Sequence, residues 1–507
     1  MTAPQALSED QAAAYDLAAE ALTSAGVGLV SGDLRPAPEG RQSTLAVLGK
    51  AGSGKTLLLA ELVRALGAAG VETVSADWET RKKRDRRTVA ILAPTNKAAS
   101  VLRLRGVPAT TIHRILYTPV YDPEYEKIAA WLAEGAARPS VEGLTDAALD
   151  RAQAFYAQQK SIPGALAAAG LRGSDFITGW KRREDPLDIG LIDEASMLDD
   201  KQLHDLQQIF GTLILFGDPA QLAPVGQSGA MCFDSLPAPR KCHLNRIHRQ
   251  AADNPILDLA HALSEPDLDF GGFEARVHAA AASDERIVVT PRADPAAMTR
   301  APVLVWRNAT RVRLINAFRA AYGAPGDDLL PGEPLICDGI ELPLKHRKKR
   351  LDLEARGLIK GAQVVYLGPG RRVGFSRLHV LGAEDPQVNA ATIIKIELPG
   401  EEEPLIPAAA TMGAAFLHGA ACTIHKAQGS QWPDVQVFVP DLFAAAQAGR
   451  TEAGIPLWKR LAYVAITRAQ ERLHWVTRYR LGRPATGLTT DDLTTLPAPS
   501  LVLDPPS

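Results

Sequence analysis

The chain has few cysteines and no long apolar run. Four cysteines occur in 507 residues without any CxxC pair, so we expect neither a disulfide framework nor a zinc site, and a reducing, cytoplasmic location is favoured. No apolar run reaches membrane-spanning length, and the N-terminus lacks the basic start and apolar core of a signal peptide. The formal net charge of −2 excludes a uniformly basic nucleic-acid binder but leaves local basic grooves possible.

A glycine-rich segment between an apolar strand pattern and an apolar helix pattern predicts a nucleotide site. The segment reads Gly-Lys-Ala-Gly-Ser-Gly-Lys-Thr from Gly49 to Thr56. In a phosphate-binding P-loop, successive backbone N–H groups converge on phosphate oxygens where a helix begins. Gly49 and Gly54 would permit backbone conformations that a Cβ obstructs. Lys55 would reach the β- and γ-phosphates, and the Thr56 hydroxyl would hold Mg²⁺.

Paired carboxylates follow a second buried strand pattern. The run from residue 187 ends in Asp193 and Glu194. Beside a P-loop, the first carboxylate would order Mg²⁺ and the second would orient and deprotonate the attacking water. Without the P-loop, the same pair would be read as a helix N-terminal cap. A third buried strand pattern ends near Gln221, which could report whether a γ-phosphate is present, and these strands indicate one doubly wound sheet.

Smaller polar clusters also follow strand patterns and are weaker signals. Thr95 and Asn96 form one cluster, and Thr111 and His113 form another. Such side chains can hold a phosphodiester backbone without reading its sequence, or they can be ordinary helix caps. Gln11 also has two interpretations. It completes a capping box with Ser8, or its amide pairs with an adenine edge.

The ordered motifs resemble those of superfamily 1 DNA helicases over roughly residues 5 to 480. Motifs I, Ia and Ib match the P-loop and the two polar clusters, and Gln11 matches the adenine-binding glutamine. The pairs Asp-Glu-Ala-Ser-Met and Gly-Asp-Pro-Ala-Gln-Leu resemble motifs II and III, and residues 243–250 resemble motif IV. Residues 421–430, with Thr-Ile-His-Lys-Ala-Gln-Gly-Ser, resemble motif V, and residues 461–469 resemble motif VI. The motif V wording is similar to the RecD-like branch, which includes the phage Dda helicase.

The resemblance implies an ATP and Mg²⁺ site between two RecA-like motors. Arg249 and Arg468 would reach from the second motor to neutralise charge on the γ-phosphoryl group, with Arg246 as a competitor for Arg249. The implied catalytic set is Lys55, Glu194, Gln221, Arg249 and Arg468. The implied nucleotide contacts are Gln11, Gly49, Gly52, Ser53, Gly54, Lys55 and Thr56, and the metal ligands are Thr56 and Asp193. The implied DNA contacts are Thr95, Asn96, Thr111, His113, Asn308, Thr310, Thr423 and His425.

The expected fold is α/β, with two RecA-like P-loop motors carrying two insertions. The first motor comprises residues 1–113 and 187–240, and the second comprises 241–339 and 412–483. Residues 114–186 form an inserted pin-type subdomain that is longer than a simple hairpin. Residues 340–411, where short strand patterns alternate with turns, form an inserted SH3-like β-barrel. Residues 484–507 lack periodicity and are expected to be a flexible tail.

The expected function is an ATP-dependent DNA helicase that translocates on single-stranded DNA. The branch that the chain resembles moves 5′ to 3′, and it implies single strands and single-strand/duplex junctions as partners of a monomeric motor. Repair, recombination or replication proteins are possible further partners, and RNA remains possible as the track. Two alternatives stay open: a DNA-stimulated ATPase that remodels protein–DNA complexes, and a subunit of a RecBCD-like complex.

Overall fold

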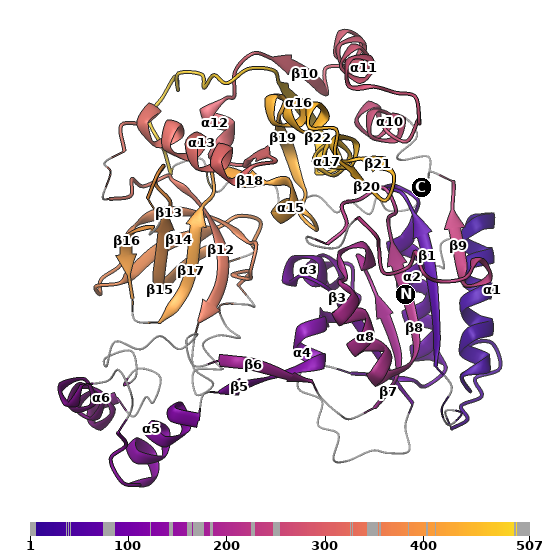
Figure 1. The fold of residues 1–507 in the computed structure, drawn as a ribbon, viewed down its shortest axis with the longest axis horizontal. Helices are drawn as coiled ribbons and strands as arrows, with labels where there is room; N and C mark the ends of the chain where they lie inside the picture. Colours follow the sequence, from indigo (N-terminus) through magenta and orange to yellow (C-terminus); the bar gives the residue numbers. More distant parts are fainter. Residues whose placement is uncertain are drawn as a thin grey trace.

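The computed structural model contains three main β-sheets (Figure 1). The structure describes residues 7–36, 38, 40, 42–74, 87–121, 123–140, 145–159, 165, 177–182, 186–224, 229–246, 254–324, 326, 328–341, 353, 356–383, 385–401, 404–410, 412–490 and 493. No helix in these ranges is long and apolar enough to cross a membrane. Within the same part of the chain, no group of three or more His, Cys, Asp or Glu side chains is arranged to hold a metal ion.

The first sheet is parallel, with seven strands, and it carries the glycine-rich segment. Its order is β2-β3-β7-β8-β1-β9, and β4 pairs with β3. The strands are β1 (Ser43–Gly49), β2 (Glu72–Thr73), β3 (Thr88–Ala93), β4 (Ala109–Thr111), β7 (Leu187–Ile192), β8 (Phe210–Gly217) and β9 (Lys241–Leu244). The expected domain end at residue 240 falls before β9, which pairs with β1 and therefore belongs to this first sheet.

Helices cover both faces of the first sheet because alternate strand residues point to opposite sides. Val47 and Ile91 pack with α1 (Glu9–Ser24), α2 (Lys55–Ala68) and α3 (Asn96–Leu104) in one buried cluster. Their neighbours Ala46 and Leu92 pack with α4 (Ile112–Leu116) and α8 (Asp200–Ile209) in another. The doubly wound sheet expected from the sequence is therefore present.

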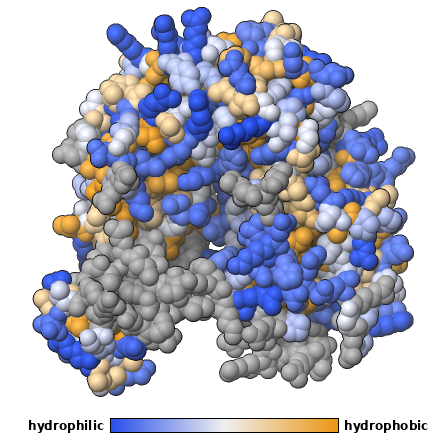
Figure 2. All heavy atoms as spheres, in the orientation of Figure 1, coloured by the Kyte–Doolittle hydropathy of each residue, from blue (hydrophilic) through white to orange (hydrophobic). Residues whose placement is uncertain are grey.

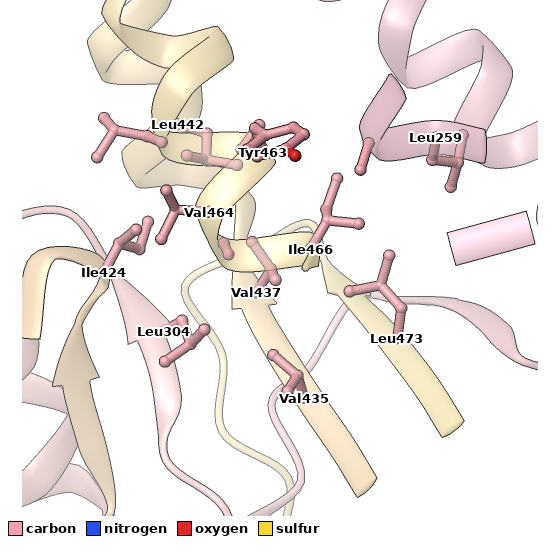
Figure 3. Close-up of a cluster of buried hydrophobic side chains, with 14 of the residues drawn as sticks. Leu259, Leu304, Ile424, Val435, Val437, Leu442, Tyr463, Val464, Ile466 and Leu473 are labelled. Atoms are coloured by element: carbon pink, nitrogen blue, oxygen red, sulfur yellow. The ribbon is translucent and has the colours of Figure 1, made fainter. Parts of the chain in front are cut away.

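The second sheet has five parallel strands in the order β10-β22-β19-β11-β18. These are β10 (Ile287–Thr290), β11 (Val303–Val305), β18 (Ala421–Thr423), β19 (Trp432–Phe438) and β22 (Ala469–Val476). The associated helices are α10 (Pro255–Ala262), α11 (Phe270–Ser283), α12 (Pro295–Met298), α13 (Asn308–Ala321), α15 (Ile424–Ala427), α16 (Val439–Gln447) and α17 (Leu457–Ile466). Figure 3 shows the core between this sheet and α17, where Val437, Val464 and Ile466 come together. Two parallel α/β units are thus present, as expected.

The third sheet closes on itself. Its order is β14-β13-β12-β17-β15-β16, and an additional pairing of β14 with β15 completes the ring. The strands are β12 (Pro334–Glu341), β13 (Gln363–Pro369), β14 (Phe375–Val380), β15 (Gln387–Ile396), β16 (Leu405–Ala409) and β17 (Gly413–His418). The closed sheet begins before residue 340 and ends after residue 411, so it is longer at both ends than the expected insertion.

Buried ion pairs fasten the closed sheet to α13 of the second motor. Arg319 on α13 donates from Nε to Glu333 Oε2 at 3.0 Å, and His418 Nε2 lies 3.0 Å from the same oxygen. Arg311 on α13 pairs with Glu397, and Asn316 Nδ2 donates to the Glu397 carbonyl at 3.1 Å. Burial of Arg319 and Glu333 is offset because each has several hydrogen-bond partners, so this contact is specific.

The insertion in the first motor begins with β5 (Tyr117–Tyr121) and ends with β6 (Ile177–Arg182), and these two strands pair antiparallel to form a stalk. Helices α5 (Pro123–Glu134) and α6 (Asp146–Gln159) lie at its far end (Figure 1). At its base, Tyr117 and Arg182 both contact Asp205 on α8. The stalk is therefore anchored to the first motor.

The described part of the expected tail packs against the fold. Leu488 lies on a buried cluster of the second motor, and Leu493 is 5% exposed. This corrects the expectation of a flexible tail for these residues, because their apolar side chains are covered. On the face shown in Figure 2, hydrophilic residues predominate among the coloured residues.

Candidate active site and nucleic-acid interface

The glycine-rich segment forms a tight loop between β1 and α2. Gly52 and Gly54 have φ values of +83° and +78°, which side chains with a Cβ rarely adopt. Gly49 is needed for a different reason: a Cβ there would lie 2.3 Å from Ser53 Oγ. The special backbone conformation expected for Gly54 is therefore present, whereas Gly49 leaves space for the Ser53 side chain.

The polar groups of this loop point inward. Lys55 Nζ donates to the carbonyl oxygens of Gly49 at 2.6 Å and Lys50 at 3.1 Å. Ser53 Oγ is buried without a hydrogen-bond partner within the described chain. A buried hydroxyl without a partner is costly unless a ligand satisfies it, and a phosphate oxygen would do so. Thr56, in the first turn of α2, follows directly. The loop thus fits a nucleoside triphosphate.

Gln11 joins α1 to this loop. Its Oε1 accepts from the Ser8 backbone N–H at 2.9 Å, so the capping box is present. Its Nε2 points at the carbonyl oxygens of Ser53 and Gly54, both at 3.4 Å. Gln11 is fully buried. The structure therefore shows the capping interpretation and also places the amide beside the loop.

The two carboxylates lie where β7 ends. Burial raises the pKa of Asp193, and the Glu194 carboxylate raises it further, whereas the Lys55 ammonium lowers it. Glu194 has φ +52°, an uncommon conformation outside glycine, and makes no capping hydrogen bond with its side chain. Its Oε2 instead accepts from Gln221 Nε2 at 3.1 Å. These contacts disfavour the helix-cap interpretation and join the ends of β7 and β8.

The second motor contributes a buried tyrosine that the sequence did not single out. Tyr463 on α17 donates its hydroxyl to Asp218 Oδ2 at 2.7 Å and accepts from the Ala51 N–H at 2.8 Å. Burial raises the pKa of Asp218. His261 Nε2 on α10 lies 3.2 Å from the Ala51 carbonyl oxygen. Tyr463 could have been found from the sequence because it lies within the motif VI segment. No sequence motif includes His261.

Two further residues of the second motor reach the loop after β8. Arg460 Nη1 donates to the Gln221 carbonyl at 2.7 Å, and Gln428 Nε2 donates to the Leu222 carbonyl at 3.2 Å. Arg460 is only 4% exposed. Because Arg460 and Tyr463 are three residues apart on α17, both lie on the helix face directed at the first motor.

The expected arginines have different outcomes. Arg468 is 5% exposed, and its guanidinium donates to the carbonyl oxygens of Val464 and Ser430. Burial lowers its pKa, whereas the charges of Glu194 and Asp218 raise it, so it lies within electrostatic range of both. Arg249 lies outside the described residues. The competitor Arg246 is exposed, and its backbone N–H donates to Asp10.

On the first motor, the expected nucleic-acid contacts lie at strand ends. Thr95 caps α3 by accepting from the Ala98 N–H at 3.1 Å, and Asn96 is the first residue of that helix. Thr111 is 7% exposed and precedes α4, on which His113 is exposed. The caps anticipated as an alternative are therefore present for Thr95.

On the second motor, Thr423 caps α15 and His425 is half-buried on that helix. Asn308 is exposed at the start of α13 and accepts from Arg311 Nε at 2.8 Å. The expectation for Thr310 is corrected. Thr310 is 1% exposed, and its hydroxyl donates to the buried Asp441 at 2.9 Å, so it stabilises the interior.

The two sets of contacts meet where α3 faces α15. A Cβ on Gly429 would lie 3.3 Å from Thr95 Oγ1. Beside it, Lys97 Nζ lies 4.9 Å from the centre of the Trp432 ring. Burial lowers the pKa of Lys97 to about 8. Neither Lys97 nor Trp432 was expected from the sequence, although both adjoin motif segments.

Comparisons with known proteins found two family models and several solved structures similar to this chain. A model described as an AAA domain matches residues 36–287, and one described as a UvrD-like helicase C-terminal domain matches residues 418–476. No curated protein matches the chain. Pif1 helicase from Candida albicans is similar in structure, with 16% identity, a TM-score of 0.45 and coverage of 93% of this chain and 95% of that one. Pif1 helicase from Bacteroides in complex with ADP-AlF3 and ssDNA has 14% identity, a TM-score of 0.45 and coverage of 93% and 92%.

The evidence for the family comes from both halves of the chain. The AAA domain contains the glycine-rich loop and the paired carboxylates, and the UvrD-like helicase C-terminal domain contains Tyr463 and Arg468. With the motifs in their expected order, the chain is a helicase with an AAA domain and a UvrD-like helicase C-terminal domain.

Proposed function

We propose that this helicase moves along single-stranded DNA in the 5′ to 3′ direction and separates duplex DNA ahead of it. One observation carries the proposal. The Tyr463 hydroxyl from the second motor bonds both the glycine-rich loop and Asp218 of the first. A nucleotide bound on that loop would therefore sense the position of the second motor, and hydrolysis would be coupled to movement.

The catalytic roles follow from the positions of the side chains. Lys55 would leave its two loop carbonyls and donate to the β- and γ-phosphates, while Ser53 Oγ gains an acceptor. Glu194 would orient and deprotonate water, held in place by Gln221. Thr56 and Asp193 would hold Mg²⁺, which neutralises phosphate charge. Arg468 would be released from its backbone acceptors to approach the γ-phosphate.

The DNA track would cross both motors. Thr95, Asn96, Thr111 and His113 of the first motor would bind the backbone, followed by Thr423, His425 and Asn308 of the second. Contacts with phosphates carry no sequence information, which suits a motor that must move along any sequence. Binding would weaken as the salt concentration rises. Each phosphate contact would make the slope of log K against log salt concentration steeper by about 0.7.

The insertions would act on the DNA. We infer that the β5–β6 stalk with α5 and α6 is the pin-type subdomain, and that the closed sheet is the SH3-like domain. Their strand pairings support these assignments. We further propose that the protein is a monomer. We also propose that it is cytoplasmic, and the four free cysteines are in line with a reducing compartment. A DNA-stimulated ATPase subunit of a larger repair complex is the second candidate.

Unwinding of tailed duplexes tests the proposal. The purified chain is mixed with ATP, Mg²⁺ and a duplex carrying either a 5′ or a 3′ single-stranded tail. We expect unwinding with the 5′ tail and none with Lys55→Ala, whereas Lys201→Ala, an exposed lysine on α8, should behave as the wild type. A preference for the 3′ tail would overturn the polarity. DNA-stimulated ATP hydrolysis without unwinding would favour the subunit alternative.

A further inference from the structure

All strands of the second sheet end on the same side of it, which we call its carboxyl edge. Because β18, β11, β19, β22 and β10 are parallel, their carboxyl ends lie at the same edge, where ligands of open α/β sheets bind. Val305 is in register with Thr423, and Phe438 with Val476. The segments that follow these strands therefore lie in a row, from Thr423 through Arg307 and Asp441 to Tyr479.

This edge is basic although the whole chain has a net charge of −2. Exposed cationic side chains occur in the segments after β10, β11, β18 and β22, namely Arg292, Arg307, Arg313, Lys426, Arg478 and Arg480. Two acidic side chains lie near these residues: Asp441, after β19, is buried and bonded to Arg307, whereas Asp294, after β10, is exposed. The local excess of positive charge favours a polyanion.

An aromatic side chain lies at the β22 end of this row. Tyr479 is 53% exposed, an unusual position for a large aromatic ring in this protein. The Tyr479 and Phe438 rings are nearly perpendicular, with ring centres 4.7 Å apart, and the Arg313 guanidinium lies over the Tyr479 ring, 5.6 Å from its centre. Arg307 Nη2 donates to its hydroxyl at 2.9 Å. The ring is therefore held in place while much of its surface stays available.

We propose that Tyr479 and the arginines around it form an additional binding site for single-stranded nucleic acid on the second motor. A base would stack on the Tyr479 ring, and Arg478 and Arg480 would contact the flanking phosphates. Exposed aromatic rings in a basic groove bind successive bases in this way without reading sequence. The inference rests on the proposed function, since it extends the same track beyond Thr423 and Asn308.

The position of the site determines how long a single-stranded nucleic acid must be to reach it. Tyr479 follows β22, which is separated from β18 by β19 and β11. At about 4.8 Å between strands, the site lies about 14 Å from Thr423 across the sheet edge. Only a strand long enough to pass Thr423 and Asn308 reaches the ring, so the site extends the length of DNA that the protein occupies.

Binding of oligothymidylates of increasing length, from about 4 to about 16 nucleotides, tests the inference by fluorescence anisotropy. Tyr479→Ala should bind short oligonucleotides as the wild type does and long ones at least about 5-fold more weakly, since a stacked base contributes about 1 kcal/mol or more. Tyr479→Phe should retain the length dependence because the ring remains. Arg478→Gln with Arg480→Gln should reduce the salt slope for long strands alone, by up to about 0.7 per contact.

Phe443→Ala is the matched control, since Phe443 is 48% exposed on α16 and packs against Phe270. It should change binding at no length. Equal affinities of wild type and Tyr479→Ala for every oligonucleotide would overturn the inference, as would an equal loss at all lengths. Failure of the wild type to bind any oligonucleotide would overturn the proposed function together with this extension of it.

Discussion

Tyr463 and Asp218 are joined across the two motors by a hydrogen bond of 2.7 Å between buried groups. The same hydroxyl accepts from the backbone N–H of Ala51. The contact therefore links α17, the loop after β8 and the glycine-rich loop at one oxygen atom.

Tyr463→Phe removes that oxygen and leaves the ring in place. Asp218 then loses a partner while buried, which costs about 1 to 3 kcal/mol for a group of this kind. We expect DNA-stimulated ATP hydrolysis to fall about 10-fold or more, measured as kcat under saturating DNA. Tyr366→Phe, a buried tyrosine in the closed sheet, is the control and should keep wild-type hydrolysis. Unchanged hydrolysis in Tyr463→Phe would show that the contact is not needed for coupling.

Glu194→Gln should bind ATP and stall its hydrolysis. The amide keeps the shape and still bonds with Gln221, but it cannot take a proton from water. We expect a loss of about 10²- to 10⁴-fold in kcat with little change in nucleotide affinity, measured by fluorescent-nucleotide binding and phosphate release. Glu471→Gln, an exposed glutamate on β22, controls for removal of a charge. Near-normal turnover in Glu194→Gln would contradict its role as the base.

Arg460→Gln should lower kcat and leave KM for ATP close to normal. Arg460 does not belong to the glycine-rich loop but holds the carbonyl of Gln221, so it is a positioning residue for the hydrolysis step. A hydrogen bond from a charged donor contributes about 1.5 to 3 kcal/mol, equivalent to about a 10-fold loss or more. Arg460→Lys should recover part of it. Arg276→Gln, which breaks an exposed ion pair with Glu265, is the control; a rise in KM alone in Arg460→Gln would refute the positioning role.

Lys97→Met should raise Tm at pH 7 in a pH-dependent way. Burial lowers the pKa of Lys97 from 10.5 to about 8, so below pH 8 the folded chain carries a charge that burial disfavours. Between about pH 8 and 10.5 the unfolded chain binds more protons than the folded one, so the cost is relieved as pH rises. The gain from the substitution should therefore shrink over that range in thermal melts. Lys201→Met should give no such trend, and a pH-independent gain would contradict the assignment.

The sequence predicted the first sheet and its ligand end well because their signals are local. Three stretches predict their local structure from neighbouring residues alone. They are the Gly49–Thr56 segment, the buried strand before Asp193 and the polar segment that ends at Gln221. Two predictions were wrong, one on the exposure of Thr310 and one on the order of the described tail residues. The sequence correctly places Thr310 after a strand. Its burial, however, depends on a hydrogen bond to Asp441, which is far away in sequence. Leu488 lies in a segment without periodicity and is covered by contacts that periodicity does not report.

The contacts between motors could not be predicted. Tyr463, Arg460 and Gln428 each bond a backbone or side-chain group that is more than two hundred positions away. Their partners are set by how two folded sheets dock, and no local pattern encodes that. The predicted domain boundary at residue 240 differs from the structure for a related reason. The strand β9 is short, and its pairing with β1 depends on tertiary contacts that the local sequence does not report.

The anchoring of the two outgrowths has a consequence for observing the motor at work. The β5–β6 stalk is fixed to α8, and the closed sheet is fixed to α13 by Arg319 and Glu333. A rotation that moves one sheet toward or away from the other therefore carries the stalk and the closed sheet with it and changes the distance between them. An energy-transfer dye pair, with one dye on each outgrowth, would record such opening and closing in single molecules while leaving both the nucleotide and the strand unlabelled.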